Sequence, residues 1–266
     1  MSLQIVHCEQ GSPEWHAARA GAITASMFSE VRKRVGGLTP QQQTYVNELM
    51  AYGCEKSAMV AAGYKSKPRA ESVERALAGE NVGDFTAAAK DYAFRLAIER
   101  ISGRPLDEMD QFETYAMRRG RELEPEARRA HEFHSSVDVV QTGLVLTEDG
   151  KFGASADGLI GTDGGAEYKC LMSPERIRAV ILSGDLSEFT DQVQGCLWLT
   201  GRKWWHFCLY CPALADIGRA LTVHAVERDD DYIAALETDL IEFDRLVMTY
   251  EAKLRAGTDP CASEAA

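Results

Sequence analysis

Two carboxylates and one lysine lie close together in the stretch from Phe152 to Cys170. Asp157 is followed ten residues later by Glu167, and Lys169 lies two residues beyond Glu167. Side chains of a β-strand alternate between its faces, so Glu167 and Lys169 point to one side and Tyr168 to the other. Converging carboxylates are typical of Mg²⁺ sites, and a lysine beside such a site can orient or deprotonate a water and stabilise charge on a phosphate.

Glycines predict how the chain brings these groups together. Gly161, Gly164 and Gly165 are turn signals between Asp157 and Glu167, so residues 152–170 are expected to form a hairpin. A hairpin would place Asp157 next to the face that carries Glu167. The alternative is a solvated hairpin with one ion pair, because the E-x-K pattern alone is very common.

The composition is that of an ordinary soluble globular protein. The chain has 266 residues, 45% of them hydrophobic and 26% charged, which suits one α/β domain or a domain with an insertion. It has no run of 18 apolar residues and no signal-peptide pattern, so we expect no membrane association and a cytoplasmic location. Seven cysteines without framework spacing fit a reducing compartment. Neither the pair Cys208/Cys211 nor the pair His131/His134 is assigned a metal.

Charge is unevenly distributed. The net charge of −12 argues against nucleic acid binding, which normally leaves a basic surface. However, residues 1–134 hold 18 Lys and Arg against 19 Asp and Glu, whereas residues 135–266 hold 11 against 22. An acidic exterior is compatible with one positive cleft, and it would repel DNA elsewhere.

The N-terminal segment 11–30 predicts a short helix, a glycine turn and a second helix that begins near Thr24 to Ser26. Trp15 and Arg19 are four residues apart and so share a helix face. Ser26 at a helix N-terminus would favour an anion. The alternative is a capped helix with a buried tryptophan and a surface arginine.

Residues 38–78 are predicted to be a helical insertion, because Gly36-Gly37 and Gly79 bound them and Thr39-Pro40 is a strong helix start. The segment resembles the N-terminal part of phage terminase small subunits, in its L-T-P-x-Q opening at Leu38 and its A-A-G-Y sequence ending at Tyr64. A DNA-binding helix-turn-helix unit and a helical decoration are both left open.

Further helices are expected over 84–102 and 110–134. In the second, Leu123, Ala127, Ala130 and Phe133 recur with helical spacing, and Glu124 lies beside that stripe, pointing toward the metal. Strands are expected over 137–147 and 203–211, with helices after Ser173-Pro174, within 188–201 and over 230–256. The arginines of the second helix either line a phosphate path or form a solvated face.

Taken together, the motifs resemble those of the lambda-exonuclease and YqaJ-type viral recombinase family of the PD-(D/E)xK nuclease superfamily. The resemblance spans nearly the whole chain outside the insertion. Its motifs are W-H-A-A-R-A-G-A-I-T-A-S (15–26), G-R-E-L-E-P-E-A-R (120–128), S-A-D-G-L (155–159), E-Y-K-C (167–170), Q-V-Q-x-x-x-W (192–198) and V-E-R-D (226–229). Ala156 stands where lambda exonuclease has proline. The resemblance implies an α/β fold with a mixed β-sheet flanked by helices, in one exonuclease domain over 1–266.

The resemblance also implies the roles of the site residues. Asp157 and Glu167 would bind two Mg²⁺ ions, for which Mn²⁺ is a substitute, with the main-chain carbonyl of Tyr168 and the Glu124 carboxylate as further ligands. Lys169 would position the attacking water. The residues expected at the terminal 5′-phosphate and the strand end are Trp15, Arg19, Ser26, Ser155 and Gln194.

The activity implied is 5′-to-3′ degradation of one strand of linear double-stranded DNA, leaving a 3′ overhang for phage-type recombination in a bacterial host cell. Family members form a ring of three subunits and cooperate with a single-strand annealing protein. The alternatives are another PD-(D/E)xK endonuclease or exonuclease, and a non-catalytic DNA-binding or packaging module led by the insertion.

Overall fold

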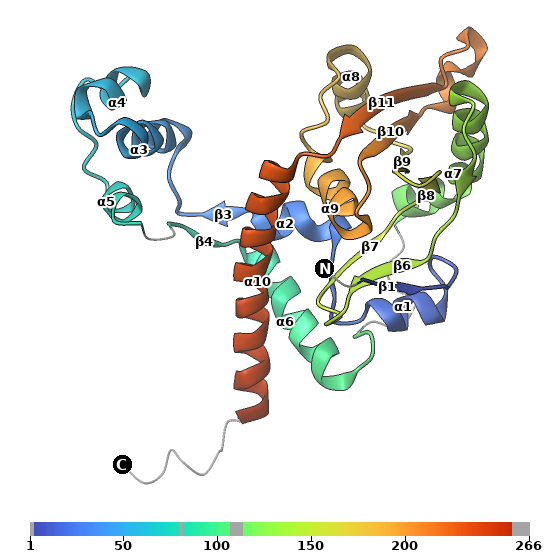
Figure 1. Cartoon of the computed structure of the whole chain (residues 1–266), viewed down its shortest axis with the longest axis horizontal. Coiled ribbons are helices and arrows are strands. Elements are labelled where there is room, and N and C mark those ends of the chain that lie inside the picture. Colours follow the sequence, from blue (N-terminus) through green and yellow to red (C-terminus); the bar gives the residue numbers. More distant parts are fainter. Residues whose placement is uncertain (1–2, 80–81, 107–113, 257–266) are drawn as a thin grey trace. The chain divides into compact units, whose positions relative to one another are not determined.

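The computed structural model describes residues 3–79, 82–106 and 114–256 (Figure 1). The chain divides into two compact units. The sheet unit comprises Met1–Val31 and Asp91–Ala266, and the helical unit comprises Arg32–Lys90. None of the helices within the described ranges is long and apolar enough to cross a membrane.

The sheet unit contains a four-stranded sheet with the order β1-β6-β7-β2. Its strands are β1 (Leu3–Val6), β6 (Leu144–Thr147), β7 (Phe152–Ser155) and β2 (Ile23–Thr24). The β1–β6 and β6–β7 pairs are antiparallel, whereas β2 and β7 are parallel. The sheet therefore brings the N-terminal segment beside the strand that precedes Asp157.

A second, five-stranded sheet carries the other candidate residues, in the order β11-β10-β9-β8-β5. Its strands are β11 (Leu221–Glu227), β10 (Trp204–Tyr210), β9 (Gly164–Lys169), β8 (Gly158–Ile160) and β5 (Val139–Val140). Only the β9–β10 pair is parallel among the pairs of this sheet in the described residues. The predicted α/β fold with mixed sheets is confirmed.

Helices flank both sheets. They are α1 (Pro13–Arg19), α2 (Phe28–Arg32), α6 (Ala87–Ser102), α7 (Tyr115–Ser135), α8 (Pro174–Ser183), α9 (Thr190–Thr200) and α10 (Asp230–Ala256), with the 3₁₀ turns η1 (Ala25–Met27) and η2 (Pro212–Ile217). Helix α9 contacts β6 and β7 of the first sheet and β10 of the second. Its Val193, Cys196 and Leu197 are buried, so this helix connects the two sheets through the core.

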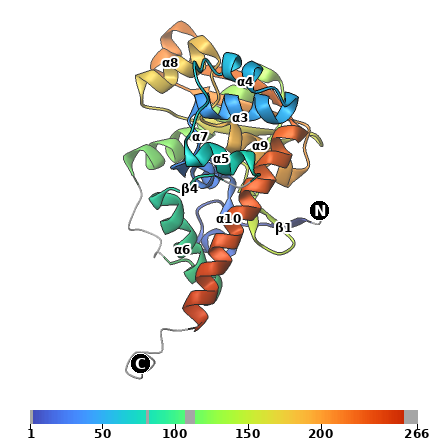
Figure 2. The ribbon, with the colours of Figure 1, turned by 90° about the vertical axis from the view of Figure 1, so that its left-hand side faces the viewer.

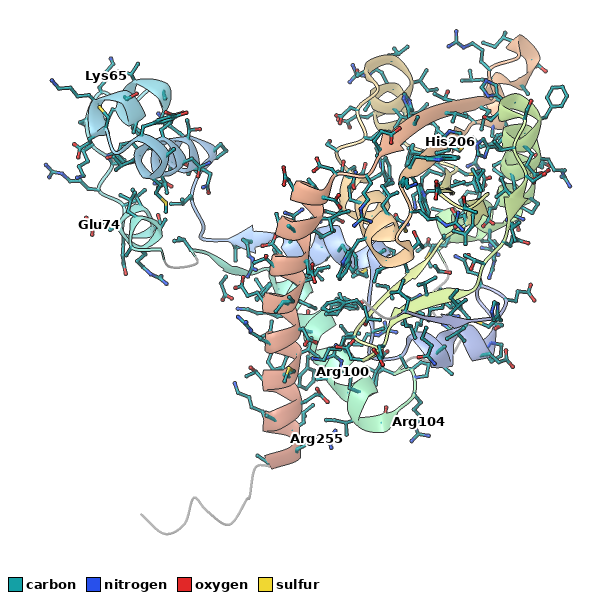
Figure 3. All side chains as sticks on the ribbon, viewed as in Figure 1. Lys65, Glu74, Arg100, Arg104, His206 and Arg255 are labelled. Carbon is teal, nitrogen blue, oxygen red and sulfur yellow. The ribbon has the colours of Figure 1, made fainter. Side chains whose placement is uncertain are left out.

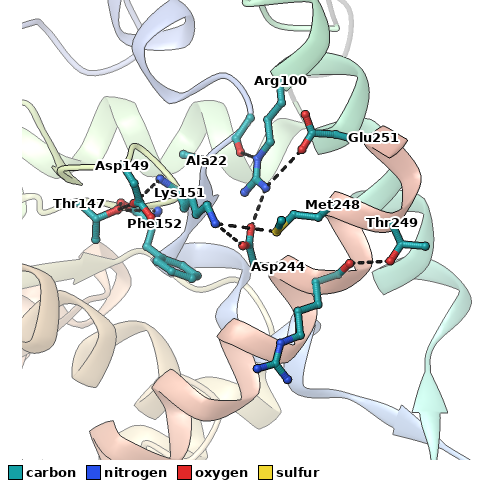
Figure 4. A network of polar contacts seen from close by, with 12 residues as sticks. Ala22, Arg100, Thr147, Asp149, Lys151, Phe152, Asp244, Met248, Thr249 and Glu251 are labelled. Carbon is teal, nitrogen blue, oxygen red and sulfur yellow. Dashed lines mark hydrogen bonds and ion pairs between the residues drawn. The ribbon is translucent and has the colours of Figure 1, made fainter. Parts of the chain in front are cut away.

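Helix α10, predicted from the sequence, is held by a buried ion-pair network (Figure 4). Asp244 accepts from Arg100 Nη1 at 2.6 Å and from Lys151 Nζ at 2.8 Å. Arg100 Nε also donates to the carbonyl of Gly21 at 2.8 Å. A buried carboxylate is tolerated when each of its oxygens is paired. Helix α10 therefore lies beside α6, as both views show (Figures 1 and 2).

The predicted hairpin over 152–170 is wrong in part. Strand β7 belongs to the first sheet, and the hairpin in the second sheet joins only β8 and β9. Gly161 has a φ of +50° and turns the chain, but Gly164 and Gly165 begin β9. A Cβ on Gly165 would lie 2.2 Å from the Trp205 ring, so this glycine permits close packing rather than a turn.

Other boundaries differ from the sequence prediction. Residues 137–147 form two strands in different sheets, and the helix expected over 84–102 begins at Ala87. Residues 110–113 of the next predicted helix lie outside the described residues. In α7 the predicted apolar stripe is wrong at Phe133, which is 90% exposed, whereas His131 is fully buried.

The helical unit has its own apolar core. It contains α3 (Pro40–Tyr52), α4 (Glu55–Ala61), α5 (Glu71–Leu77) and a two-stranded ribbon of β3 (Arg34–Val35) and β4 (Asp84–Phe85). Thr39 begins α3 with a capping box, as its Thr-Pro sequence indicates. Tyr45, Val46, Ala58, Ala62 and Val73 form the buried cluster. The unit is longer at both ends than the insertion 38–78, because the ribbon belongs to it.

Candidate active site

Strand β9 positions Glu167 and Lys169 on one face, as the alternation predicted. Lys169 Nζ donates to Glu167 Oε1 at 2.7 Å, and Tyr168 points to the opposite side of the sheet, toward α7. The Glu167 side chain is buried, with an exposed fraction of 3%. A buried carboxylate in contact with a half-buried ammonium indicates a site rather than a solvated hairpin.

Asp157 lies in the step between β7 and β8. Its Oδ2 accepts the main-chain N–H of Tyr168 at 2.7 Å, and the next residue, Gly158, pairs with Ala166. This register fixes Asp157 beside the Glu167 strand. Asp157 is therefore close to Glu167, as expected. The cause is the passage of the chain from one sheet to the other between β7 and β8, and not a continuous hairpin.

The third carboxylate, Glu124, comes from α7 and forms an ion pair with Arg128. Burial raises the pKa of Asp157 well above its ordinary value, and the charges of Glu167 and Glu124 raise it further. Burial also raises the pKa of Glu124, with Glu167 adding to it and Arg128 opposing it. The three carboxylates therefore share one electrostatic environment with an excess of negative charge.

The residues fit a divalent cation in their donor chemistry. Oxygen ligands from carboxylates suit Mg²⁺, and Glu167 Oε2 is buried without a hydrogen bond from any described residue. Within the described ranges, no three His, Cys, Asp or Glu side chains surround one point closely enough to hold a metal ion as they stand. Glu124 is paired with Arg128 instead.

Gln192 of α9 completes the contacts of the lysine. Its Nε2 donates to Glu167 Oε1 at 2.6 Å, and its Oε1 accepts from Lys169 Nζ at 3.0 Å. The sequence analysis missed this residue and selected Gln194. The Q-V-Q pattern at the start of a helix was the available signal, but the helical phase that decides between the two glutamines was not known.

Gln194 lies elsewhere. It is buried, and its amide donates to the carbonyl of Glu227 at 2.9 Å and accepts from the N–H of Asp229 at 3.0 Å. Residues two apart on a helix do not face the same way, so Gln194 is separated from the Lys169 contacts that Gln192 makes. In the structure its amide links β11 to the start of α10.

Two of the expected strand-end residues meet next to the carboxylates. The indole Nε1 of Trp15 donates to Ser155 Oγ at 3.1 Å, and Ser155 is two residues before Asp157. Arg19 lies over the Trp15 ring, with its Cζ 4.4 Å from the ring centroid. The predicted shared face of Trp15 and Arg19 is therefore present.

Ser26 is connected to this group through Thr24. Arg19 Nη2 donates to Thr24 Oγ1 at 3.2 Å, and Thr24 Oγ1 lies 3.4 Å from Ser26 Oγ. Ser26 is exposed within the turn η1, and α2 behind it has only five residues. The helix expected to begin near Thr24 to Ser26 thus begins at Phe28, after a 3₁₀ turn, which leaves little helix dipole at Ser26.

Arg19 also lines a cavity of about 230 Å³. Its polar lining includes His16, Arg95, Tyr92 and Glu99, and the sequence analysis missed all four. Arg95 Nε pairs with Glu99 at 2.9 Å. Burial lowers the pKa of His16, and the neighbouring cations Arg19 and Arg95 lower it further. The charge of Arg95 is therefore balanced within the cavity by Glu99, and Arg19 is the other cation of its lining.

Behind β9, Tyr168 begins a chain of buried hydrogen bonds. Its hydroxyl lies 2.9 Å from His131 Nδ1, and His131 Nε2 lies 2.9 Å from His206 Nδ1. Burial lowers the pKa of His131 to about 4, with His206 adding to the effect. His131 is therefore neutral at neutral pH, and the chain fixes the back of the strand that carries Glu167 and Lys169.

Comparison with known proteins gives one family match. The family model of the YqaJ-like viral recombinase domain matches residues 14–203. This range contains every site residue named above, from Trp15 to Gln194. Among curated proteins none matches the chain. The similarity of 38–64 to terminase small subunits stays a prediction.

Solved structures agree with that match. The crystal structure of an alkaline exonuclease, LHK-Exo, from Laribacter hongkongensis is 26% identical over 92% of this chain and 97% of that chain, with a TM-score of 0.62. The structure of LHK-Exo in complex with dAMP has the same identity and coverage, with a TM-score of 0.64.

Proposed function

The chain belongs to the YqaJ-like viral recombinase family, and from that premise we propose that it is a metal-dependent 5′-to-3′ exonuclease. It degrades one strand of linear double-stranded DNA and leaves a 3′ single-stranded overhang for recombination by strand annealing. The observation that carries the proposal is the contact of Lys169 with the buried Glu167 and with Gln192, beside Asp157.

Two Mg²⁺ ions are the proposed cofactor, with Mn²⁺ as a substitute. Asp157 and Glu167 would hold them, together with Glu124 and the main-chain carbonyl of Tyr168. The buried Oε2 of Glu167 supports this assignment, because a buried anionic oxygen without a partner is costly. When bound, the ions supply Lewis-acid polarisation and charge relief to the phosphodiester.

Lys169 acts as a donor. Burial alone would lower the pKa of Lys169, but the Glu167 and Asp157 carboxylates outweigh it and raise the pKa above its ordinary value. The ammonium therefore keeps its proton at neutral pH and can donate hydrogen bonds to the attacking water or to a phosphate oxygen. Gln192 holds the ammonium in that direction through its Oε1.

The strand end is bound by the residues around Arg19. Its guanidinium offers a planar fork of donors that suits phosphate oxygens, and the Trp15 ring beneath restrains it. Ser26 and Ser155 add hydroxyls next to this guanidinium. A 5′-phosphate held there would lie near the carboxylates, because Ser155 precedes Asp157 by two residues. Gln194 would contribute only through the main chain that it holds.

The assembly proposed is a ring of three copies that cooperates with a single-strand annealing protein in the cytoplasm of a bacterial host. Apolar side chains exposed on the sheet unit support an association of chains: Phe133 is 90% exposed and Val140 is 65% exposed. Sedimentation at micromolar concentration tests the ring, and a strict monomer would contradict it.

The activity is tested on linear duplexes labelled at either the 5′ or the 3′ end. With Mg²⁺, the 5′ label is expected to be released first as mononucleotide, and chelation of the metal should stop the reaction. Lys169→Ala should abolish cleavage and keep DNA binding. Release of the 3′ label first, or wild-type rates from Lys169→Ala, would overturn the proposal.

A further inference from the structure

The helical unit differs in charge from the rest of the chain. Arg32–Lys90 holds 9 Lys and Arg against 6 Asp and Glu, a net charge of +3. Since the whole chain has a net charge of −12, the remaining residues have a net charge of −15. A polyanion would be repelled by most of the sheet unit's exterior but not by the helical unit. The helical unit is therefore the better candidate for contact with a polyanion such as DNA.

The positive charge is concentrated around one connection. Residues 56–70 contain Lys56, Lys65, Lys67 and Arg69 and no Asp or Glu. The last three occupy every second position in the connection 62–70 between α4 and α5, and all three are exposed. Figure 3 shows Lys65 at this connection, with its side chain extending away from the helices.

Apolar contacts fix both ends of the connection. At one end Ala62 is buried, and the Tyr64 ring packs edge-on against Tyr45 with centroids 5.9 Å apart. At the other end Ala70 packs against the same core. Pro68 restricts the residues between, so the segment that carries the cations loses less conformational entropy on binding than a free loop.

The cations are available to an external anion. Lys67 Nζ contacts Glu55 at 3.0 Å, but both side chains are about half exposed, at 54% and 48%. An exposed ion pair of this kind contributes only about 0–1 kcal/mol, so a phosphate can replace Glu55 at little cost.

We infer that the connection 62–70 of the helical unit binds the phosphate backbone of duplex DNA away from the strand end. The inference rests on the proposed function in one respect, namely that the substrate is duplex DNA. It assigns a second contact, independent of Arg19 and of the carboxylates. Such contacts position DNA without reading its sequence.

The test measures binding to a DNA duplex that has no free ends, under conditions in which the protein cannot cleave it. The ligand is a duplex of about 30 base pairs closed by a hairpin loop at each side, in a chelating buffer, and affinity is measured between about 50 and 200 mM NaCl. Each phosphate contact contributes a slope of about −0.9 in a plot of log K against log salt. The full-length triple variant Lys65→Ala/Lys67→Ala/Arg69→Ala should therefore have a slope that is shallower by about 2.7.

The matched control removes the same charge from exposed positions of the sheet unit: Lys203→Ala/Lys253→Ala/Arg255→Ala. Its slope should equal that of the wild type. Equal slopes for the wild type and the triple variant would overturn the inference, as would an equal loss in the control, which would indicate net charge alone. If the wild type does not bind the closed duplex, the inference fails, whereas the proposed function is judged separately by the digestion of end-labelled linear duplexes. Circular dichroism confirms that both variants are folded.

Discussion

Trp15 and Ser155 are 140 residues apart in the chain, yet the indole of one donates to the hydroxyl of the other at 3.1 Å. This bond joins α1 to the strand that leads into Asp157. Because Arg19 lies over the same indole, a ligand of Arg19 is held at a fixed place relative to the carboxylates. The geometry predicts that end recognition and cleavage are coupled.

Arg19→Ala should lower the preference for a 5′-phosphorylated duplex over a 5′-hydroxyl duplex by about 10- to 100-fold, the effect of losing about 1.5–3 kcal/mol of charged hydrogen bonding. Initial rates on the two duplexes measure it. Arg104→Ala, an exposed arginine of the same unit, is the control and should keep the wild-type preference. If the wild type digests both ends at one rate, Arg19 has no such role.

Gln192→Ala should reduce the turnover rate by about 10- to 100-fold and leave DNA affinity nearly unchanged, since it removes an orienting contact of Lys169 and not a charge. Gln194→Ala makes the comparison. It removes the two hydrogen bonds that the buried Gln194 amide makes to the main chain of Glu227 and Asp229, so it should lower the melting temperature more than the rate per folded molecule. The reverse pattern would contradict the assignment of Gln192.

His131→Gln should change the pH dependence of stability. The pKa of His131 falls from 6.5 to about 4 in the folded state, so the unfolded chain binds the proton more readily. The stability that the neutral His131 side chain contributes is fully present above about pH 6.5. It is lost as the pH falls toward 4, by up to about 3 kcal/mol of the free energy of unfolding. Denaturant unfolding at several pH values measures this.

The control for that experiment is His7→Gln, because His7 is exposed and does not contribute to the lowered pKa of His131. It should keep the wild-type loss of stability between pH 6.5 and 4. An identical loss in His131→Gln would show that other groups cause the acid sensitivity.

Removal of residues 38–78 should leave the rest of the chain folded. The ribbon pairs Val35 with Asp84, so the two ends of the deletion already lie close together. The apolar cluster around Tyr45 and Val73 is removed as a whole, which leaves no half of a core exposed. We expect a soluble protein with cooperative thermal unfolding when a short glycine linker joins the ends. An insoluble product would show that the segment supports the sheet unit.

The parts of the site that depend on local periodicity were predictable. Alternation in one strand was enough to place Glu167 and Lys169 on one face and Tyr168 on the other. Helical spacing placed Arg19 over Trp15 in the same way. These relations involve neighbours within one element, so the sequence contains them directly.

The parts that depend on distant partners were not predictable. His131 is buried because Tyr168 and His206, 37 and 75 residues away, satisfy both of its nitrogens. Gln192 was passed over because nothing local sets the rotation of α9. Gly165 looked like a turn residue because glycine also serves where a ring must approach the backbone, and Trp205 lies 40 residues further on.

The position of β9 between β8 and β10 limits which insertions and deletions this lineage can accept. One residue gained or lost inside β9 would exchange the faces of Glu167 and Tyr168, since strand neighbours point in opposite directions. By contrast, the turn at 161–163 can change in length without altering either pairing register. Homologous sequences should therefore keep the two-residue spacing from Glu167 to Lys169 without gaps, whereas alignment gaps between Asp157 and Glu167 should fall in that turn.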